Sequence, residues 1–497
     1  MSEHRENMAG QENPPAKKKN RWVSWLGILC SLVITGVVVW FAVQIWQTQF
    51  VPADLMKMAC LGLGAVLLVA VLLLLNHRHV VRFILGVLLS AAMICALVMG
   101  GRMVQEGVDA LERITTAHSQ IEYVGVYVPK DDPIEYLDEA AGYTFGLWAT
   151  MDQELTDKVV TTLNETLHTS IATASYETLP ELLDALYAGD VQAIIFPDAF
   201  FDLLQEMDGY ADVEERIRPL ITLDFAVETG ELEKPVLPDH TFAVYISGID
   251  SRNGLLAKSR SDVNILAYVN TRTRQVLLIS TPRDYFVPLS ISNGARDKLT
   301  HAGIYGVNVS KDTIGMIYDI DIDYYFRVNF EGFEEIIDSL GGVDVYSQHT
   351  FSTGLYQYYE GMNHLNGKEA LAFARERYAL PGGDRDRGKN QMAVIQGVIN
   401  KALSPDILKN YSSVLKAVEG NFETSVPYEL VAELVRDQLE GGGDWDIITY
   451  SVDGTGDSQI PYSMSMYAYV MWPDEATVAK AQDMIDAMEN NQIITQP

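Results

Sequence analysis

The chain has 497 residues, enough for several domains, and its formal net charge is −31 at pH 7. This acidic balance argues strongly against nucleic acid as a partner, because a phosphate backbone repels it. The three cysteines, Cys30, Cys60 and Cys95, all lie in apolar segments. The long polar part of the chain therefore contains neither a disulfide framework nor a cysteine-based metal site.

Three long apolar runs follow a polar N-terminal tail, residues 1–21, which we predict to be disordered. The runs cover about 22–46, 55–75 and 83–101, and each is close to the roughly 20 residues that cross a bilayer. The first run is too long for a signal peptide and lacks a small-residue cleavage site. We therefore predict three transmembrane helices over residues 22–103.

Basic residues are distributed unevenly around these runs. The tail ends in Lys17-Lys18-Lys19 and Arg21, and the loop between the second and third runs is basic from His77 to Arg82. The loop between the first two runs, Gln47–Asp54, contains no basic residue. The positive-inside rule therefore predicts a multi-pass membrane protein with a cytoplasmic N-terminus and an extracellular domain after the third helix.

Residues 121–225 alternate between strand-like and helix-like segments. The predicted strands are 124–128, 144–149, 171–176 and 191–197, and the predicted helices are near 152–168 and 179–189. This alternation predicts a small three-layer α/β accessory domain with a largely parallel sheet. The run Leu186–Phe196 resembles one lobe of an extracellular solute-binding protein. The segment contains no catalytic constellation, so we interpret it as a docking or accessory module. Residues 226–239 are acidic and contain Pro and Gly, which predicts a linker.

Residues 240–490 are predicted to form one large α/β domain. It opens with three strands, Thr241–Ser247, Val263–Val269 and Val276–Ser280. If consecutive strands are antiparallel, the end of the first, the start of the second and the end of the third meet at one sheet edge. That edge would gather Asp250, Arg260, Asp262 and Arg283. Ligands of open α/β sheets bind at such strand ends.

Two carboxylates beside arginines suit a phosphate ligand held together with a hard cation. Mg²⁺ takes one or two protein carboxylates plus phosphate oxygens, and arginines hold the remaining phosphate charge. The nine histidines are scattered along the chain, so no zinc site is predicted. The sequence also lacks a nucleophile elbow, a P-loop and a Rossmann fingerprint.

The stretch Arg375–Gln391 supplies further arginines. The run Gly367–Ala374 predicts a helix that ends near Arg375 and Arg377, and Pro381-Gly-Gly383 then breaks the chain. A second helix is predicted from about Asn390, so that Asp384, Asp386 and Arg387 would lie in the loop before it. The N-terminus of that helix would suit an anion. For this stretch alone, a solvated, self-paired charge cluster is an equal alternative.

Six motifs, taken together and in this order, resemble the LytR-CpsA-Psr (LCP) family of cell-wall phosphotransferases. They are Gly248-Ile-Asp250, Ser259-Arg-Ser-Asp262, Ile279-Ser-Thr-Pro-Arg-Asp284, Asp297-Lys-Leu-Thr-His-Ala302, Asp338-Ser-Leu-Gly-Gly-Val343 and Arg375–Gln391. The resemblance covers residues 240–490 and implies an α/β/α sandwich. It also implies an enzyme that moves a glycopolymer with one phosphate from a polyprenyl-pyrophosphate carrier to peptidoglycan. Teichoic acid, capsule and other wall glycans remain open as the polymer.

The resemblance further implies roles for individual residues. Asp250 and Asp262 would hold Mg²⁺ or Mn²⁺, which makes the expected enzyme metal-dependent. The implied pyrophosphate ligands are Arg260, Arg283, Arg375, Arg377, Arg387 and Gln391. Of these, Arg283, Arg375 and Arg377 are also expected to be catalytic. Asp384 matches the acidic position that would act on the acceptor hydroxyl, with Asp386 as the alternative. The chain departs from the family in having three membrane helices instead of one, and Lys389 where arginine is common.

Two other functions would use the same residues. One is a pyrophosphatase that acts on polyprenyl-pyrophosphate glycan with water as the acceptor. The other is a non-catalytic receptor or regulator that binds lipid-linked glycan. Retention of both Asp250 and Asp262 with all the arginines favours catalysis, because binding alone does not require the metal pair.

A polyprenyl tail predicts a hollow core, since water would reject it at about 0.8 kcal/mol per exposed CH₂. We expect an apolar channel between the sheet and its helices, open at the end that carries Arg283 and Arg377. The candidate walls are the strands Val263–Val269 and Val276–Ile279 and the helix face that contains Phe333, Ile336, Ile337 and Leu340.

Overall fold

The computed structural model describes residues 21–48, 51–76, 80–116, 119–228, 238, 240–251, 253–404, 411–440 and 443–496. The chain divides into two compact units, Met1–Gln105 and Glu106–Pro497. Three predicted features fall wholly or largely outside the described residues: the tail up to residue 20, residues 77–79 of the basic loop, and most of the linker.

Three long helices form the first unit: α1 (Arg21–Gln47), α2 (Ala53–Leu75) and α3 (Val80–Thr116), the last of which continues into the second unit. All three are long and apolar enough to cross a membrane. They meet around Ile34, Ala70 and Leu97. A Cβ on Gly27 would lie 2.6 Å from the backbone oxygen of Leu74, so this small residue allows the close helix approach that is typical of membrane bundles. The three predicted helices are confirmed, although α3 continues to Thr116, past the predicted end at residue 103.

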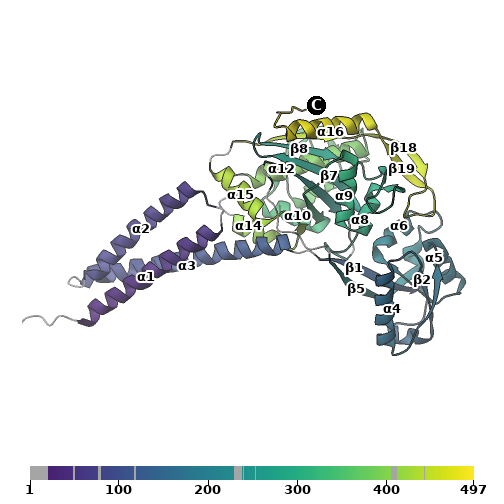
Figure 1. The fold of residues 1–497 in the computed structure, drawn as a ribbon, viewed down its shortest axis with the longest axis horizontal. Coiled ribbons are helices and arrows are strands. Elements are labelled where there is room, and N and C mark those ends of the chain that lie inside the picture. Colours follow the sequence, from purple (N-terminus) through teal and green to yellow (C-terminus); the bar gives the residue numbers. More distant parts are fainter. Residues whose placement is uncertain are drawn as a thin grey trace, which may run out of the picture. The chain divides into compact units, whose positions relative to one another are not determined.

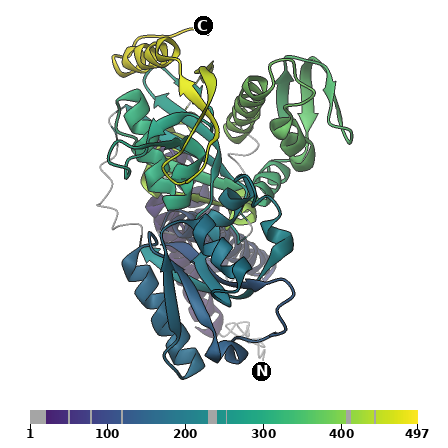
Figure 2. The same ribbon diagram turned by 90° about the vertical axis from the view of Figure 1, so that its right-hand side faces the viewer.

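A five-stranded sheet with the order β3-β2-β4-β1-β5 organises residues 119–228. Its strands are β1 (Ser119–Pro129), β2 (Thr144–Trp148), β3 (Ala172–Tyr176), β4 (Ala193–Pro197) and β5 (Ile217–Glu228). Its helical segments are η1 (Leu137–Gly142), α4 (Gln153–Leu167), α5 (Leu179–Ala188), η2 (Asp198–Phe200), α6 (Phe201–Gln205) and α7 (Val213–Arg216). One face packs against α4 and the other against α5 and α6 (Figures 1 and 2). This is the expected three-layer arrangement.

The prediction of a largely parallel sheet needs correction. Strands β2, β3 and β4 are parallel to one another, but β1 is antiparallel to both β4 and β5. Alternating strands and helices produce parallel neighbours, whereas β5 follows short helices and returns along β1 as a long antiparallel ribbon. Its last residues, 226–228, were expected in the linker but belong to this strand.

A six-stranded sheet with the order β16-β11-β6-β7-β8-β17 forms the centre of the C-terminal half. Its strands are β6 (Thr241–Ile249), β7 (Ser261–Asn270), β8 (Gln275–Ser280), β11 (Tyr324–Asn329), β16 (Phe422–Thr424) and β17 (Asp446–Ser451). The antiparallel meander β6-β7-β8 is confirmed. Strand β11 was not predicted; it pairs in parallel with β6.

Helices cover both faces of this sheet and make the predicted α/β/α sandwich (Figure 1). One face packs against α9 (Val307–Tyr318) and α16 (Glu475–Glu489). The other face packs against α12 (Asp384–Ala402) and, near β6, against α15 (Tyr428–Leu439).

Smaller elements complete this half. They are β9 (Phe286–Pro288), β10 (Arg296–Lys298), η3 (Leu299–His301), α8 (Ala302–Tyr305), α10 (Phe330–Ser339), β12 (Val343–Ser347), β13 (Phe351–Ser352), β14 (Gln357–Tyr358), β15 (Gly361–Leu365), α11 (Gly367–Arg375), α14 (Tyr411–Val418), β18 (Gly454–Gln459) and β19 (Ala468–Pro473). Helices α10, α11 and α12 share a core with β12 and β15, and this part forms the green lobe in Figure 2.

Helix α12 begins six residues earlier than predicted, at Asp384 instead of Asn390. Gly383, just before it, has a positive φ of 58°, which glycine adopts without strain. Asp384 and Asp386 then occupy the first turn, where carboxylates interact favourably with the helix dipole. Asp384, Asp386 and Arg387 are therefore helical residues and not part of a loop.

Candidate active site

A cavity of about 520 Å³ lies between the six-stranded sheet and helices α10, α11 and α12. The sheet contributes apolar side chains from β6, β7 and β11, among them Ile246, Val263 and Val328. The helices contribute Phe330, Phe333, Ile336 and Ile337 from α10, Leu371 and Ala374 from α11, and Ile395, Val398 and Ile399 from α12. The body of the cavity is therefore apolar, and the predicted hollow core is present.

The walls differ in part from the prediction. Leu340 and strand β8 do not line the cavity. Leu277 and Ile279 of β8 are instead fully buried in the solid core on the opposite face. The cavity lies over β6 and β11 because α10 and α11 cover that end of the sheet, whereas α12 packs onto β7, β8 and β17.

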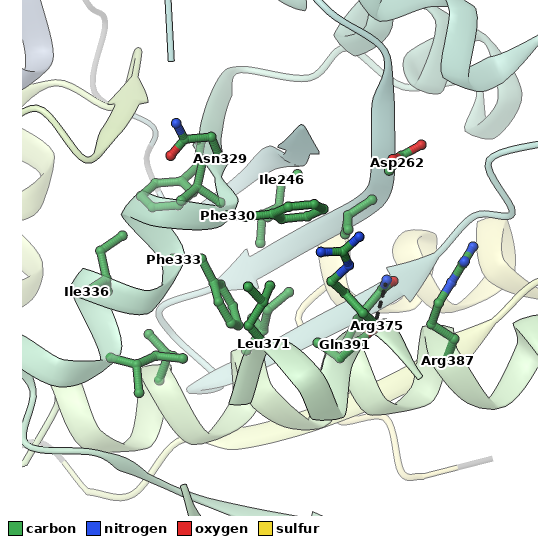
Figure 3. Close-up of a pocket in the computed structure, with 18 of the residues that line it drawn as sticks. Ile246, Asp262, Asn329, Phe330, Phe333, Ile336, Leu371, Arg375, Arg387 and Gln391 are labelled. Atoms are coloured by element: carbon green, nitrogen blue, oxygen red, sulfur yellow. Dashed lines mark hydrogen bonds between the residues drawn. The ribbon is translucent and has the colours of Figure 1, made fainter. Parts of the chain in front are cut away.

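Polar groups gather at one end of the cavity (Figure 3). They are Asp262, Arg283, Arg375, Arg377, Arg387 and Gln391. Figure 3 shows Asp262, Arg375, Arg387 and Gln391 at this end, with Phe333, Leu371 and Ile336 toward the other. The structure therefore brings together six of the nine residues that the sequence placed in the site.

Each arginine is positioned by a different element. Arg283 follows β8, and its Nη1 lies 2.8 Å from Oδ1 of Asp262 at the start of β7. Arg375 is the last residue of α11, and its guanidinium carbon lies 4.2 Å from the centre of the Phe330 ring. Arg377 donates from Nη2 to the hydroxyl of Tyr378 at 2.6 Å. No carboxylate in the described part of the chain pairs with Arg375 or Arg377, so these two cations are available to a ligand.

The electrostatics favour an anion at this end. Burial lowers the pKa of Arg387, and the nearby Arg283 and Arg377 lower it further, against the opposing effect of Asp384. Burial would also lower the pKa of Arg283, but Asp262 and Asp284 outweigh it and the net shift is upward. Several cations that repel one another beside an apolar cavity would be stabilised by a ligand with more than one negative charge.

Asp384 and Asp386 occupy different environments. Asp384 pairs with Arg387 and lines a small cavity of about 40 Å³ next to the arginine end. Asp386 is buried; it accepts a 2.8 Å hydrogen bond from the backbone of Gly382 and lies 3.0 Å from Nζ of Lys389. Its bonds hold the turn before α12, so Asp384 is the better placed of the two to meet a substrate.

Asp250 and Arg260 lie outside this group of residues. Asp250 follows the end of β6 at the predicted sheet edge, but it is exposed. It lines a separate cavity of about 290 Å³ against residues 119–228, which we call the accessory half. Arg260 pairs with Glu206 and Asp202, two acids that precede β5 in the accessory half. The edge position of both residues agrees with the prediction, but their side chains do not reach the arginine cavity.

The two predicted metal ligands line different cavities. Asp262 is at the site, whereas Asp250 faces the other cavity. Among the residues that the structure describes, no group of three or more His, Cys, Asp or Glu side chains could hold a metal ion. Asp262 alone fits a cation that takes most of its ligands from phosphate oxygens and water.

Several cavity residues were not predicted. Phe330 supports Arg375, and Ile246, Val328 and Leu371 form the apolar wall. The signal for Phe330 is the N-cap Asn329, whose side chain accepts from the backbone N–H of Gly332 at 2.8 Å. This cap places Phe330 in the first turn of α10, on the same face as the predicted Phe333.

Comparisons with known proteins identify the family. The LytR_cpsA_psr family model matches residues 221–483, more than half of the chain. The chain belongs to this family. It is 35% identical over 216 residues to the polyisoprenyl-teichoic acid–peptidoglycan teichoic acid transferase TagU of Bacillus subtilis (strain 168), which covers 43% of this chain and 69% of that relative. The TagU of Enterococcus faecalis (strain ATCC 700802 / V583) is 34% identical over 215 residues, or 41% of this chain and 71% of that relative.

Among solved structures, the crystal structure of B. subtilis TagU aligns with a TM-score of 0.41 and 30% sequence identity. The alignment covers 52% of this chain and all of that chain (100%). Residues 221–483 of this chain, which the family model matches, contain the six-stranded sheet and the arginine cavity. The transmembrane helices lie outside the family match, and the accessory half precedes it except for the end of β5.

Proposed function

We propose that this LCP protein is a membrane-anchored phosphotransferase that moves a glycopolymer, with one phosphate, from a polyprenyl-pyrophosphate carrier to peptidoglycan. One observation carries the proposal: a deep apolar cavity ends in four arginines, two of which have no carboxylate partner among the described residues. An apolar body with a multiply cationic end matches a lipid tail attached to a pyrophosphate. The names of the TagU relatives support the same donor and acceptor classes.

The residues divide the work by position. Arg375, Arg377 and Arg387 would hold the pyrophosphate oxygens, with Gln391 beside them, and Arg283 would hold the phosphate that is transferred. Asp384 would accept the proton of the peptidoglycan hydroxyl as that oxygen bonds to the phosphorus on the glycan side. The P–O–P bond then breaks, and polyprenyl phosphate leaves along the apolar cavity.

We propose Mg²⁺ or Mn²⁺ as the cofactor, with Asp262 as its protein ligand and Asp250 as a second ligand. When bound, such an ion would neutralise charge on the two phosphates. Asp262 lies among the arginines, which supports its part. The part of Asp250 rests on the family motif, since its side chain lies in the other cavity.

We also propose that the N-terminus is cytoplasmic and that the chain beyond about residue 104 is extracellular, where peptidoglycan is found. The basic residues at Lys17–Arg21 and His77–Arg82 support this orientation. Protease added to wall-stripped cells should remove the chain beyond α3 and leave the helices protected. Full protection of the C-terminal half would contradict both the topology and the function.

Product analysis tests the reaction itself. The full-length protein in detergent is incubated with polyprenyl-pyrophosphate glycan, peptidoglycan fragments and Mg²⁺, and the products are analysed by mass spectrometry. The expected product is a peptidoglycan fragment that carries glycan phosphate, released together with polyprenyl phosphate. Free glycan phosphate as the sole glycan product would instead indicate a pyrophosphatase, and unchanged donor would indicate a binding protein.

A further inference from the structure

A second cavity, of about 360 Å³, lies where the accessory half meets residues 240–496, which we call the catalytic half. The proposed transferase reaction makes no use of it. Its accessory wall comes from the carboxyl ends of the three parallel strands: Trp148 ends β2, Glu177 follows β3, and Pro197 ends β4. Ligands of open α/β sheets bind at this end of parallel strands. The sheet topology therefore places the cavity where a binding site is expected.

The catalytic half supplies the opposite wall. It contributes Lys258, Ile304, Tyr305 and the segment Tyr462–Ser465. This segment is firmly held, because the backbone N–H of Ser463 donates to Oδ2 of the buried Asp297 at 2.9 Å. The segment is thus fixed to the catalytic half, and the cavity is preformed, as most small-molecule sites are.

Aromatic rings form much of the cavity surface. Trp148 and Phe200 meet edge to face with ring centres 4.6 Å apart, and Tyr305 packs on Phe200 at 5.9 Å. Tyr462 is half exposed at the rim. The indole N–H of Trp148 is buried and has no hydrogen-bond acceptor among the described residues. Aromatic rings of this kind pack against the C–H face of a sugar ring and also attract cations.

The charge of the cavity is opposite to that of the arginine site. Three carboxylates line it, from Glu122, Asp152 and Glu177, against the single ammonium of Lys258. Glu122 and Lys258 form an ion pair, and the Glu122 side chain is only 7% exposed. The negative charge of the other two carboxylates would repel a phosphate, and their oxygens would accept hydrogen bonds from hydroxyl or amino groups.

We propose that this cavity binds a neutral or positively charged saccharide unit, with its ring on the aromatic wall and its hydroxyl or amino groups on the carboxylates. The site would recognise a glycan separately from the lipid-linked pyrophosphate. This inference does not rest on the proposed transferase function, because the binding it describes is measured without donor, acceptor or turnover.

Saturation-transfer NMR titrations test the proposal on the full-length protein in detergent micelles. The probes are N-acetylglucosamine (neutral), glucosamine (cationic) and glucosamine 6-phosphate (anionic at the phosphate). We expect the first two to bind saturably and the phosphate to bind at least tenfold more weakly. The proposal is overturned if neither uncharged nor cationic sugar binds, or if the sugar phosphate binds as well as they do.

Variants locate the binding. Thr150 lines the cavity and is exposed, so Thr150→Trp should block it and reduce sugar affinity at least tenfold while the fold is kept. Thr169, exposed at the opposite end of α4, does not line the cavity, and Thr169→Trp is the matched control. Glu177→Gln should weaken glucosamine more than N-acetylglucosamine, because only the former is charged. Unchanged binding by the Thr150→Trp protein would contradict the assignment.

Discussion

The two faces of the six-stranded sheet are built from the same strands but enclose different interiors. On the face covered by α9 and α16, Tyr245, Leu277, Ile279 and Ile314 are fully buried in a continuous core. On the opposite face, α12 packs directly on β7, β8 and β17, but a cavity of about 520 Å³ lies over β6 and β11, beside α10 and α11. Adjacent residues of one strand take part in each: Tyr245 in the solid core, Ile246 in the cavity wall.

The two faces therefore differ in packing density, and the face with the cavity is the less densely packed. Protein interiors are normally filled to the density of organic crystals, and the first face follows that rule. Apolar side chains around an open cavity lose part of the roughly 25 cal/mol per Å² that burial would contribute. A ligand with a long apolar part would restore this contribution, and the arginines at the cavity end indicate what lies at the head of that ligand.

The largest effect is expected from the charged end of the cavity. Asp262→Asn keeps the shape of the side chain but removes the charge that faces Arg283 and the proposed metal ion. We expect transfer to fall about a thousandfold, or about 4 kcal/mol in transition-state stabilisation, with normal folding. Transfer assays should be run beside Asp312→Asn, an exposed carboxylate on α9 that is outside the site. Full activity of Asp262→Asn, or full activity in chelator, would mean that Asp262 is structural.

Asp250→Asn sharpens this result, because the structure separates the two carboxylates. If both are metal ligands, the Asp250 variant should lose activity to a similar extent, and excess Mg²⁺ should restore part of it. Nearly full transfer by the Asp250 variant would show that Asp250 is not a required metal ligand and that its side chain stays in the cavity against the accessory half.

A smaller but still large loss is expected at Arg377. Its planar fork can bond two phosphate oxygens at once, whereas lysine offers a point charge. We expect Arg377→Lys to lose about a hundredfold in kcat/KM, nearly as much as Arg377→Ala. Arg436→Lys on α15, outside the cavity, is the control. Recovery of most activity by the lysine variant would rule out the two-oxygen geometry.

Two leucines compare the faces directly. Leu277→Ala removes a fully buried side chain from the solid face and should cost about 3 kcal/mol in the free energy of unfolding. Leu371→Ala removes a half-buried side chain from the cavity wall and should cost about 1 kcal/mol or less. Denaturant unfolding of the two variants measures the difference of about 2 kcal/mol. Equal losses would mean that the cavity side is packed as tightly as the other.

The sequence predicted the parts of the site that depend on local patterns. Short apolar runs located β6, β7 and β8, and their antiparallel order placed Asp262 and Arg283 at one edge. The helical run before Arg375 located α11. The apolar face of α10 gave Phe333, Ile336 and Ile337 as cavity walls.

The remaining features depend on contacts between distant segments. Strand β11 pairs in parallel with β6 across some 80 residues of chain (Tyr324 with Val244), and no local pattern indicates such a pairing. The cavity wall is therefore formed by β6 and β11, and not by the predicted strand β8. The contact of Arg260 with Glu206 likewise joins two halves of the chain whose docking the sequence does not specify. The early start of α12 was missed because the first six residues of the helix are five charged residues and a glycine, which give no apolar periodicity.

The chain-length dependence of lipid binding shows whether the apolar cavity holds the polyprenyl tail. Binding of polyprenyl pyrophosphates with increasing numbers of isoprene units is measured on the full-length protein by calorimetry, below the concentration at which each lipid aggregates. We expect the affinity to rise with each added unit, at up to about 0.8 kcal/mol per buried CH₂, and to level off once the cavity is full. Ala374→Phe, which narrows the cavity at α11, should bring that plateau to a shorter chain. Equal affinity for short and long chains would contradict the assignment of this cavity to the lipid.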